Sequence, residues 1–266
     1  MAETLNVIKV GGAVVEDEAS LGGLIERFAS LPGRKVLVHG GGRSATRLAA
    51  QLGIETTMVE GRRVTDEEML RVVTMVYGGL VNKQVVARLQ AAGVNALGLT
   101  GADMNVIRAH RRPVKVVRDA EGRQREVDYG FVGDIDGADG ACLAHLVGSG
   151  VTPVVAPLAH DGSGQMLNVN ADTIAATVAV ALAGHFDVTL TYCFEKPGVL
   201  ARADDEESVI RRITREDFPR LMAGGIISGG MIPKIENALS AIDRGVKRVV
   251  ITGAEDIAGC GGTVVE

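Results

Sequence analysis

Nearly continuous apolar runs recur along the chain, and segments with helical spacing of apolar residues separate them. The runs cover residues 5–10, 35–40, 94–99, 151–156, 186–192 and 246–252. Runs without polar alternation are typical of strands that are covered on both faces. Because helical segments lie between them, the pattern predicts an α/β fold with a mostly parallel central sheet and crossover helices.

Other segments predict the elements around this sheet. Residues 174–184 predict a buried helix that is too short to span a bilayer. Thr65 and Glu68 have the spacing of a capping box, which predicts a helix over 65–76 whose apolar stripe packs in the core or against another subunit. Residues 105–133 predict an antiparallel ribbon with an Asp- and Gly-containing turn. The Gly-, Ser- and Asp-rich residues 158–165 suggest a boundary between lobes 1–160 and 161–266.

Composition narrows the range of functions. Hydrophobic residues make up 46% of the chain and aromatic residues only 3%, so small aliphatic side chains fill the core. A net charge of −5 gives no field for nucleic acid or an anionic membrane. The basic residues within 108–118 therefore predict a solvated face of the ribbon. The three cysteines form no disulfide or zinc pattern, and the first strand leaves no room for a signal peptide, so we expect a cytoplasmic protein.

Three glycine clusters, at residues 10–12, 39–42 and 224–231, follow strands or open helices. Glycine lets the backbone approach a ligand closely, and a helix start offers unpaired N–H groups to an anion. The first two clusters lie at the carboxyl ends of predicted parallel strands and could hold a phosphate between them. Neither a Walker A loop nor a GxGxxG motif is present, so a nucleotide would bind in another way.

Five polar side chains stand out against the apolar pattern. Lys9 lies inside the first apolar run, and burying an unpaired ammonium group is costly, so an anion is expected opposite it. Asn168, Asn170 and Asp172 alternate, which places them on one face if the segment is extended, where they suit a polar ligand. Asp172 could instead cap the next helix. Lys234 follows two glycines near a helix start and by itself predicts only a surface lysine.

Together, these segments resemble the amino acid kinase family. The matching segments, in chain order, are IKVGG (8–12), VHGGG (38–42), GRRVT (61–65), NK (82–83), GLTGAD (98–103), MLNVNAD (166–172) and GGMIPK (229–234). The resemblance runs over essentially the whole chain. It implies a three-layer αβα sandwich whose amino-terminal lobe binds an acylated amino acid and forms a homodimer, while the carboxyl-terminal lobe binds ATP.

The resemblance also implies a reaction, in which ATP phosphorylates the side-chain carboxylate of N-acetyl-L-glutamate in arginine biosynthesis. Because that carboxylate is already ionised, catalysis would need positioning and charge neutralisation rather than a base. Lys9 and Lys234 would flank the transferred group, and Asp172 would orient them. The further implied contacts are Gly11 and Gly12 for phosphate, Gly41, Gly42, Arg63, Asn168 and Asn170 for the acylated substrate, and Glu195, Gly198 and Gly230 for the nucleotide. Mg²⁺ would bridge ATP phosphates, with much of its shell from phosphate and water.

The segment TYCFEKPGVL (191–200) departs from the family pattern. Glu195 takes the place of the usual aspartate, and Tyr192, Cys193 and Phe194 replace the usual apolar residues and serine. This variant resembles a branch of the family in which N-succinyl-L-glutamate replaces the acetylated substrate, and Arg62 or the basic residues within 108–118 could meet its extra carboxylate. A carrier-protein-linked aminoadipate or glutamate is another possible substrate.

The resemblance also bears on assembly and regulation. Family members that arginine inhibits carry an extra helix before the first strand, which this sequence does not show, so we expect a homodimer that is insensitive to arginine. A ligand-sensing regulator on a decayed kinase fold is the non-enzymatic reading of the same residues. Such a regulator has no need for two lysines that face phosphate. A nucleic-acid-binding module has only the basic ribbon in its favour.

Overall fold

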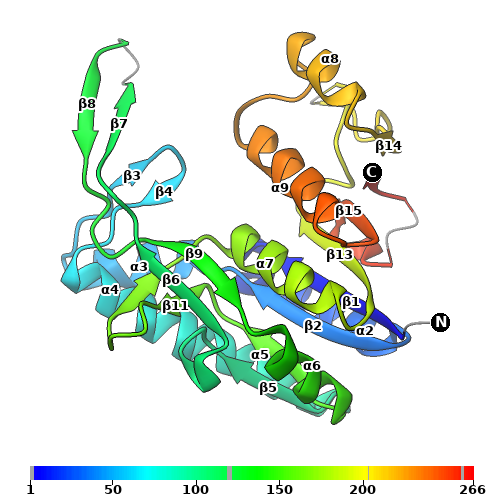
Figure 1. Cartoon of the computed structure of the whole chain (residues 1–266), viewed down its shortest axis with the longest axis horizontal. Coiled ribbons are helices and arrows are strands. Elements are labelled where there is room, and N and C mark those ends of the chain that lie inside the picture. The colour runs from blue at the N-terminus through cyan, green and yellow to red at the C-terminus, as the bar shows by residue number, and fades with distance from the viewer. Residues whose placement is uncertain (1–2, 119–121, 203, 259–260) are drawn as a thin grey trace.

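The computed structural model describes residues 3–118, 122–202, 204–258 and 261–266. Its centre is an eight-stranded sheet with the order β14-β16-β15-β13-β1-β2-β10-β5 (Figure 1). These strands are β1 (Thr4–Val10), β2 (Arg34–His39), β5 (Ala96–Leu99), β10 (Thr152–Val155), β13 (Asp187–Phe194), β14 (Arg212–Ile213), β15 (Arg248–Gly253) and β16 (Thr263–Val265). Every apolar run predicted as a strand lies in this sheet, and each adjacent pair is parallel except β15–β16.

Helices cover both faces of the sheet, so the predicted three-layer α/β architecture is confirmed. One face packs against α6 (Gly140–Gly148), α7 (Ala171–Ala183), α8 (Asp217–Ala223) and α9 (Ile232–Asp243). The other face packs against α1 (Gly12–Glu16), α2 (Glu18–Ser30), α3 (Gly42–Gln51), α4 (Glu67–Val73), the π-helix η1 (Thr74–Val81) and α5 (Asn82–Ala91). Side chains alternate along β1, so Leu5 and Val7 enter the first core, whereas Ile8 and Val10 enter the second.

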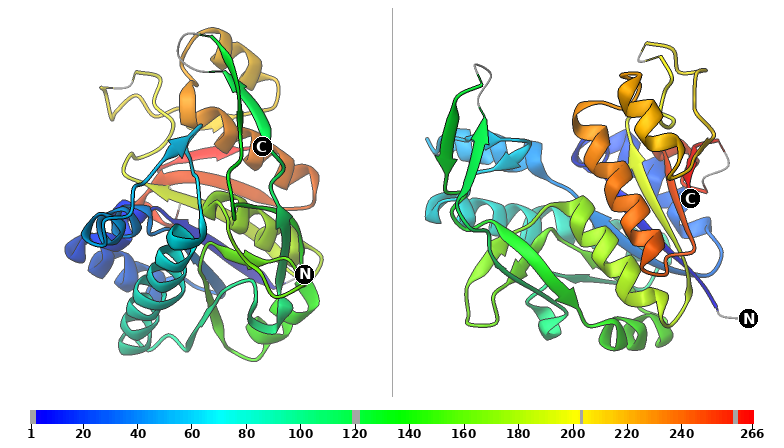
Figure 2. Two further views of the ribbon diagram at one scale, coloured as in Figure 1. Left: turned by 90° about the vertical axis from the view of Figure 1, so that its left-hand side faces the viewer. Right: turned by 45° about the horizontal axis from the view of Figure 1, so that its top comes forward.

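A smaller four-stranded sheet and two hairpins stand beside the central sheet. The smaller sheet, β12-β11-β6-β9, consists of β6 (Ile107–Arg111), β9 (Gly133–Ala138), β11 (Leu158–His160) and β12 (Met166–Asn168). One hairpin pairs β3 (Met58–Val59) with β4 (Arg62–Arg63). The other pairs β7 (Lys115–Arg118) with β8 (Gln124–Val127) and projects from the body of the molecule (Figures 1 and 2). The short turns are η2 (Asp103–Asn105), η3 (Gly229–Met231) and η4 (Ala254–Asp256).

The antiparallel ribbon predicted over 105–133 is confirmed by the pairs β6–β9 and β7–β8. The turn that the sequence predicts in this ribbon includes residues 119–121, which lie outside the described residues. The prediction of a uniformly solvated basic face is wrong at one position. Arg112 is buried, its Nη2 lies 2.5 Å from Asp134 Oδ1, and its guanidinium carbon lies 5.5 Å from the centre of the Tyr129 ring. The apolar base of the ribbon encloses this side chain, and the carboxylate of Asp134 compensates its charge.

The start of α4 also differs from the capping-box prediction. Asp66, not Thr65, caps the helix, and its carboxylate accepts a 2.8 Å hydrogen bond from the backbone N–H of Met69. Thr65 is buried, and its hydroxyl donates to the carbonyl of Arg63 and accepts from the side-chain amide of Asn168. The hydroxyl is therefore already used in tertiary contacts, and the helix begins one residue later.

No helix among the described residues combines the length and apolar character that crossing a membrane requires. The division into lobes 1–160 and 161–266 stays a prediction.

Candidate active site

Two glycine loops lie in backbone contact at the carboxyl ends of β1 and β2. The N–H of Gly40 donates a 3.0 Å hydrogen bond to the carbonyl of Val10. A Cβ atom on Gly40 would lie 2.9 Å from the nitrogen of Gly12, and one on Gly41 would lie 2.9 Å from the ring of Tyr77. Glycine is required at both positions, because a side chain on Gly40 would push the two loops apart and one on Gly41 would clash with Tyr77.

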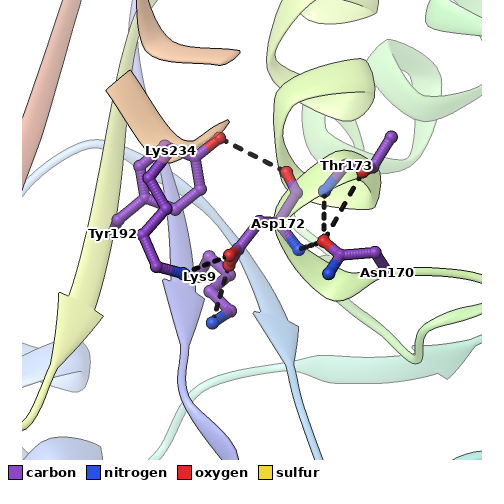
Figure 3. A network of polar contacts seen from close by, with 6 residues as sticks. All are labelled: Lys9, Asn170, Asp172, Thr173, Tyr192 and Lys234. Carbon is purple, nitrogen blue, oxygen red and sulfur yellow. Dashed lines mark hydrogen bonds and ion pairs between the residues drawn. The ribbon is translucent and has the colours of Figure 1, made fainter. Parts of the chain in front are cut away.

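Lys9 and Lys234 meet at one carboxylate between these loops and α7 (Figure 3). Lys9 Nζ lies 2.7 Å from Asp172 Oδ1, and Lys234 donates a 2.5 Å hydrogen bond to Asp172 Oδ2. The lysines come from β1 and α9, which are more than two hundred residues apart in the chain. The ion pair between Lys9 and Asp172 is almost fully buried, whereas Lys234 retains some contact with solvent.

Electrostatics keeps Asp172 ionised in this setting. Burial would raise the pKa of the carboxyl group, but the ammonium groups of Lys9 and Lys234 outweigh that effect and hold the pKa of Asp172 below its usual value. Two ammonium groups and one carboxylate leave a net charge of +1. The centre is therefore suited to an incoming anion.

The polar face that the sequence predicted over 168–172 is not one extended segment. β12 ends at Asn168, and Asn170 is the N-cap of α7, because its side-chain oxygen accepts from the N–H groups of Asp172 and Thr173 at 2.8 and 3.1 Å (Figure 3). The prediction that Asp172 could be the cap is therefore wrong. Capping by Asn170 leaves the carboxylate of Asp172 free to face the two lysines.

Two cavities flank the Lys–Asp centre and share Gly42. The first, of about 190 Å³, is lined by Gly41, Gly42, Arg62, Arg63, Asn168 and Asn170 among others. The second, of about 460 Å³, is lined by Gly11, Gly12, Arg43, Phe194, Glu195, Gly198 and Lys234 among others. A third hollow, of about 270 Å³, is lined by both Asp172 and Lys234 and also reaches Arg62 and Asn170. The structure thus places the predicted substrate residues around one cavity and most of the predicted nucleotide residues around the other.

Arg63 is fixed before any ligand arrives. It is buried, and its Nη2 donates to the carbonyl of Gly42 at 2.9 Å and to the hydroxyl of Thr46 at 3.0 Å. It comes from the hairpin β3–β4, where Glu60 and Gly61 both have positive φ angles of 49° and 74°. A two-residue turn of this kind matches the twist of the strands and aims the hairpin at the first cavity.

The predicted nucleotide residues lie at the end of β13 and before α9. Glu195 is exposed, and its carboxylate accepts a 2.9 Å hydrogen bond from Arg43 across the second cavity. A Cβ on Gly198 would lie 2.8 Å from the side chain of Val209, so glycine is required there by packing. Gly230 lies in the turn η3, and its neighbour Met231 lines the cavity.

A buried histidine that sequence reasoning passed over supports the second glycine loop. His39 Nδ1 lies 2.7 Å from the carbonyl oxygen of Gly40, and its Nε2 lies 3.1 Å from the side-chain nitrogen of Asn82. The carbonyl can only accept, so Nδ1 carries the proton and Nε2 accepts from the amide. Burial lowers the pKa of His39 to about 4, which keeps the ring neutral. Both residues lie in motifs that the sequence shows, VHGGG and NK, but neither pattern indicates their contact.

No group of three or more His, Cys, Asp or Glu side chains that could hold a metal ion occurs in the part of the chain that the structure describes.

Comparison with known proteins identifies this chain's relatives. Residues 4–253 match the model of the amino acid kinase family. The chain is 61% identical over 266 residues to an acetylglutamate kinase from Bacteroides fragilis, covering 100% of this chain and 98% of that protein. It is also 61% identical to an acetylglutamate kinase from Bacteroides thetaiotaomicron, with full coverage of both. A solved structure, smu.665 from Streptococcus mutans, matches with a TM-score of 0.78 at 28% identity, covering 98% of each chain.

Proposed function

The chain belongs to the amino acid kinase family, and on that premise we propose that it is an acetylglutamate kinase. It transfers the γ-phosphoryl group of ATP to the side-chain carboxylate of N-acetyl-L-glutamate and gives N-acetyl-L-glutamyl 5-phosphate and ADP, an early reaction of arginine biosynthesis. The observation that carries the proposal is the pair of lysines on one buried carboxylate between two cavities.

The reaction brings one anion to another, so its barrier is mainly electrostatic. A carboxylate oxygen forms a bond to the γ-phosphorus while the bond from that phosphorus to the β–γ bridging oxygen breaks, and no proton moves. Lys9 and Lys234 neutralise the charge that spreads over the transferred group and the leaving oxygen. Asp172 holds both ammonium groups in place before ATP binds, which removes the cost of ordering them during the reaction.

The first cavity suits the acylated substrate. Arg63 offers a planar guanidinium to the α-carboxylate, and Asn168 and Asn170 offer amide groups at the same cavity wall. Gly41 and Gly42 line this cavity beside the reaction centre. Because Arg63 is already held by Gly42 and Thr46, binding requires little reordering of its side chain.

The second cavity suits the nucleotide, with Gly11 and Gly12 near the phosphates and Glu195 and Gly198 toward the nucleoside. Gly230 lies in the turn η3 beside Met231, which lines the same cavity. Mg²⁺ would enter with ATP, held by phosphate oxygens and water rather than by a protein cage. That assignment agrees with the reluctance of Mg²⁺ to lose its waters.

The acyl group has a second candidate, the succinyl group, because extra cations lie near the first cavity. Arg62 lines that cavity, and burial together with the neighbouring charge of Arg112 lowers its pKa. A second carboxylate on the substrate would relieve this repulsion. Side-by-side assays with N-acetyl- and N-succinyl-L-glutamate decide between the two, and Arg62→Gln would weaken use of the succinylated substrate more than that of the acetylated one.

The experiment that tests the function traps the acyl phosphate with hydroxylamine in the presence of ATP and N-acetyl-L-glutamate. We expect turnover in the wild-type protein and a loss of more than about a hundredfold in Lys9→Ala and Lys234→Ala. Lys247→Ala, which removes an exposed lysine that pairs with Asp187, is the matched control and should keep full turnover. Wild-type rates in Lys9→Ala would overturn the proposal.

We also propose that the chain forms a homodimer, with support from an apolar surface. Met75 and Leu80, five residues apart on η1, are each 53% exposed. Large exposed apolar side chains in one region are typical of a subunit interface. Sedimentation should give a dimer that Leu80→Glu dissociates, whereas Leu52→Glu, at the exposed end of α3, leaves it intact.

A further inference from the structure

An aromatic ring faces both lysines of the reaction centre. Phe194 is the last residue of β13, and the register pairs Tyr192, two residues earlier, with Lys9. Residues that alternate along a strand share a face, so the Phe194 ring lies on the face that carries Lys9. Lys9 Nζ lies 4.9 Å from the centre of the Phe194 ring, and Lys234 Nζ lies 4.2 Å from it.

The charge of the centre explains what such a ring can do. Asp172 compensates one of the two ammonium charges, and the two lysines still repel each other through the remaining positive charge until phosphate arrives. The face of an aromatic ring carries negative potential and attracts cations within about 6 Å. Unlike a second carboxylate, a ring adds no charge that would repel the phosphates of ATP.

We propose that Phe194 is a positioning residue, whose ring, opposite Asp172, holds the ammonium groups of Lys9 and Lys234 together for phosphoryl transfer. The inference rests on the proposed kinase function and adds a residue to it. Phe194 also lines the second cavity together with Lys234, so its ring lies beside the space proposed for the nucleotide. Its stacking on Tyr192, with ring centres 6.2 Å apart and planes 13° apart, fixes the orientation of the ring.

A second lysine–phenylalanine pair provides an internal control. Lys35 Nζ lies 5.6 Å from the centre of the Phe28 ring, but it also donates hydrogen bonds to three backbone carbonyls, those of Phe28, Ala29 and Leu31. These carbonyls fix Lys35 whether or not the ring attracts it. Fluorination of Phe28 therefore reports only the general effect of fluorine in a core.

The test replaces Phe194 with 4-fluoro- and 3,4,5-trifluorophenylalanine by site-specific incorporation, because fluorine withdraws charge from the ring face with little change in ring size. We expect the single-turnover rate of acyl-phosphate formation to fall stepwise, reaching about tenfold in the trifluoro protein. The KM for N-acetyl-L-glutamate should stay unchanged. The same substitutions at Phe28 should leave the rate unchanged, and Phe194→Leu should lose at least as much as the trifluoro protein.

A rate that does not depend on fluorination, or an equal loss at positions 28 and 194, would overturn the inference. A purely structural role for the ring would give the same rate throughout the fluorinated series. If the protein with natural phenylalanine forms no acyl phosphate, the proposed function fails instead. In that case NMR of the lysine ε-methylene groups still tests the positioning: upfield shifts at Lys9 and Lys234 that vanish in Phe194→Leu support it, and their absence in the natural protein refutes it.

Discussion

Asp172→Asn removes one negative charge from between two ammonium groups and hardly changes the volume of the side chain. The native centre sums to +1, and the variant would sum to +2 in a space where the side chain of Lys9 is only 8% exposed. Removing one partner of a buried ion pair costs about 3–5 kcal/mol. Because the side chain of Lys234 is 22% exposed and can move toward water, we expect a loss near the lower limit, about 3 kcal/mol.

Urea and thermal denaturation followed by circular dichroism measure this loss. For a chain of this size, about 3 kcal/mol lowers the melting temperature by about 6–12 °C. Asp187→Asn is the matched control, since it breaks a 2.6 Å ion pair with Lys247 whose side chains are 37% and 65% exposed. Exposed pairs contribute at most about 1 kcal/mol, so this control should unfold almost as the wild type does.

Lys9→Met changes the charge of the centre in the opposite direction from Asp172→Asn, from +1 to 0. It removes one cation and leaves a single pair between Lys234 and Asp172, so its loss of stability should be smaller than that of Asp172→Asn. Both variants should lose acyl-phosphate formation. The reasoning is refuted if Asp172→Asn unfolds within about 1 kcal/mol of the wild type or keeps its turnover.

Three further predictions follow from the same geometry. Because burial lowers the pKa of His39 to about 4, whereas an unfolded histidine titrates near about 6.5, its neutral form adds stability above that pH. As the pH falls from about 6.5 to 4, the free energy of unfolding of the wild type should fall by about 3 kcal/mol relative to that of His39→Gln, as measured by urea denaturation. The same pH dependence of stability in both proteins would contradict this. Gly40→Ala, whose Cβ would meet the nitrogen of Gly12 at 2.9 Å, should lower kcat by about 10- to 100-fold. Gly22→Ala, with open space around it, should keep full turnover, so equal rates in the two variants would exclude a role for loop contact. Arg63→Ala should raise the KM for N-acetyl-L-glutamate by about 10- to 100-fold; a defect confined to ATP would contradict its placement.

Much of the fold could be predicted from the apolar runs, because a strand buried on both faces must be apolar at nearly every position. Lys9 could be singled out for the same reason, since a charge inside such a run needs a partner. The capping residues could not be assigned correctly, because Thr65 and Asp172 each have the chemistry of a cap. Which residue caps depends on whether its side chain is already used elsewhere, as that of Thr65 is by Asn168.

The sequence by itself determined the layered α/β architecture, the glycine loops and the family resemblance, because these depend on local periodicity and on short ordered motifs. The family resemblance implied that Asp172 orients Lys9 and Lys234, but only the tertiary structure decided how closely both lysines contact that carboxylate and that the Phe194 ring faces both. These contacts join strands and helices that are distant in the chain. Their geometry is set by the packing of α7 and α9 on one face of the sheet, and no local pattern records that packing.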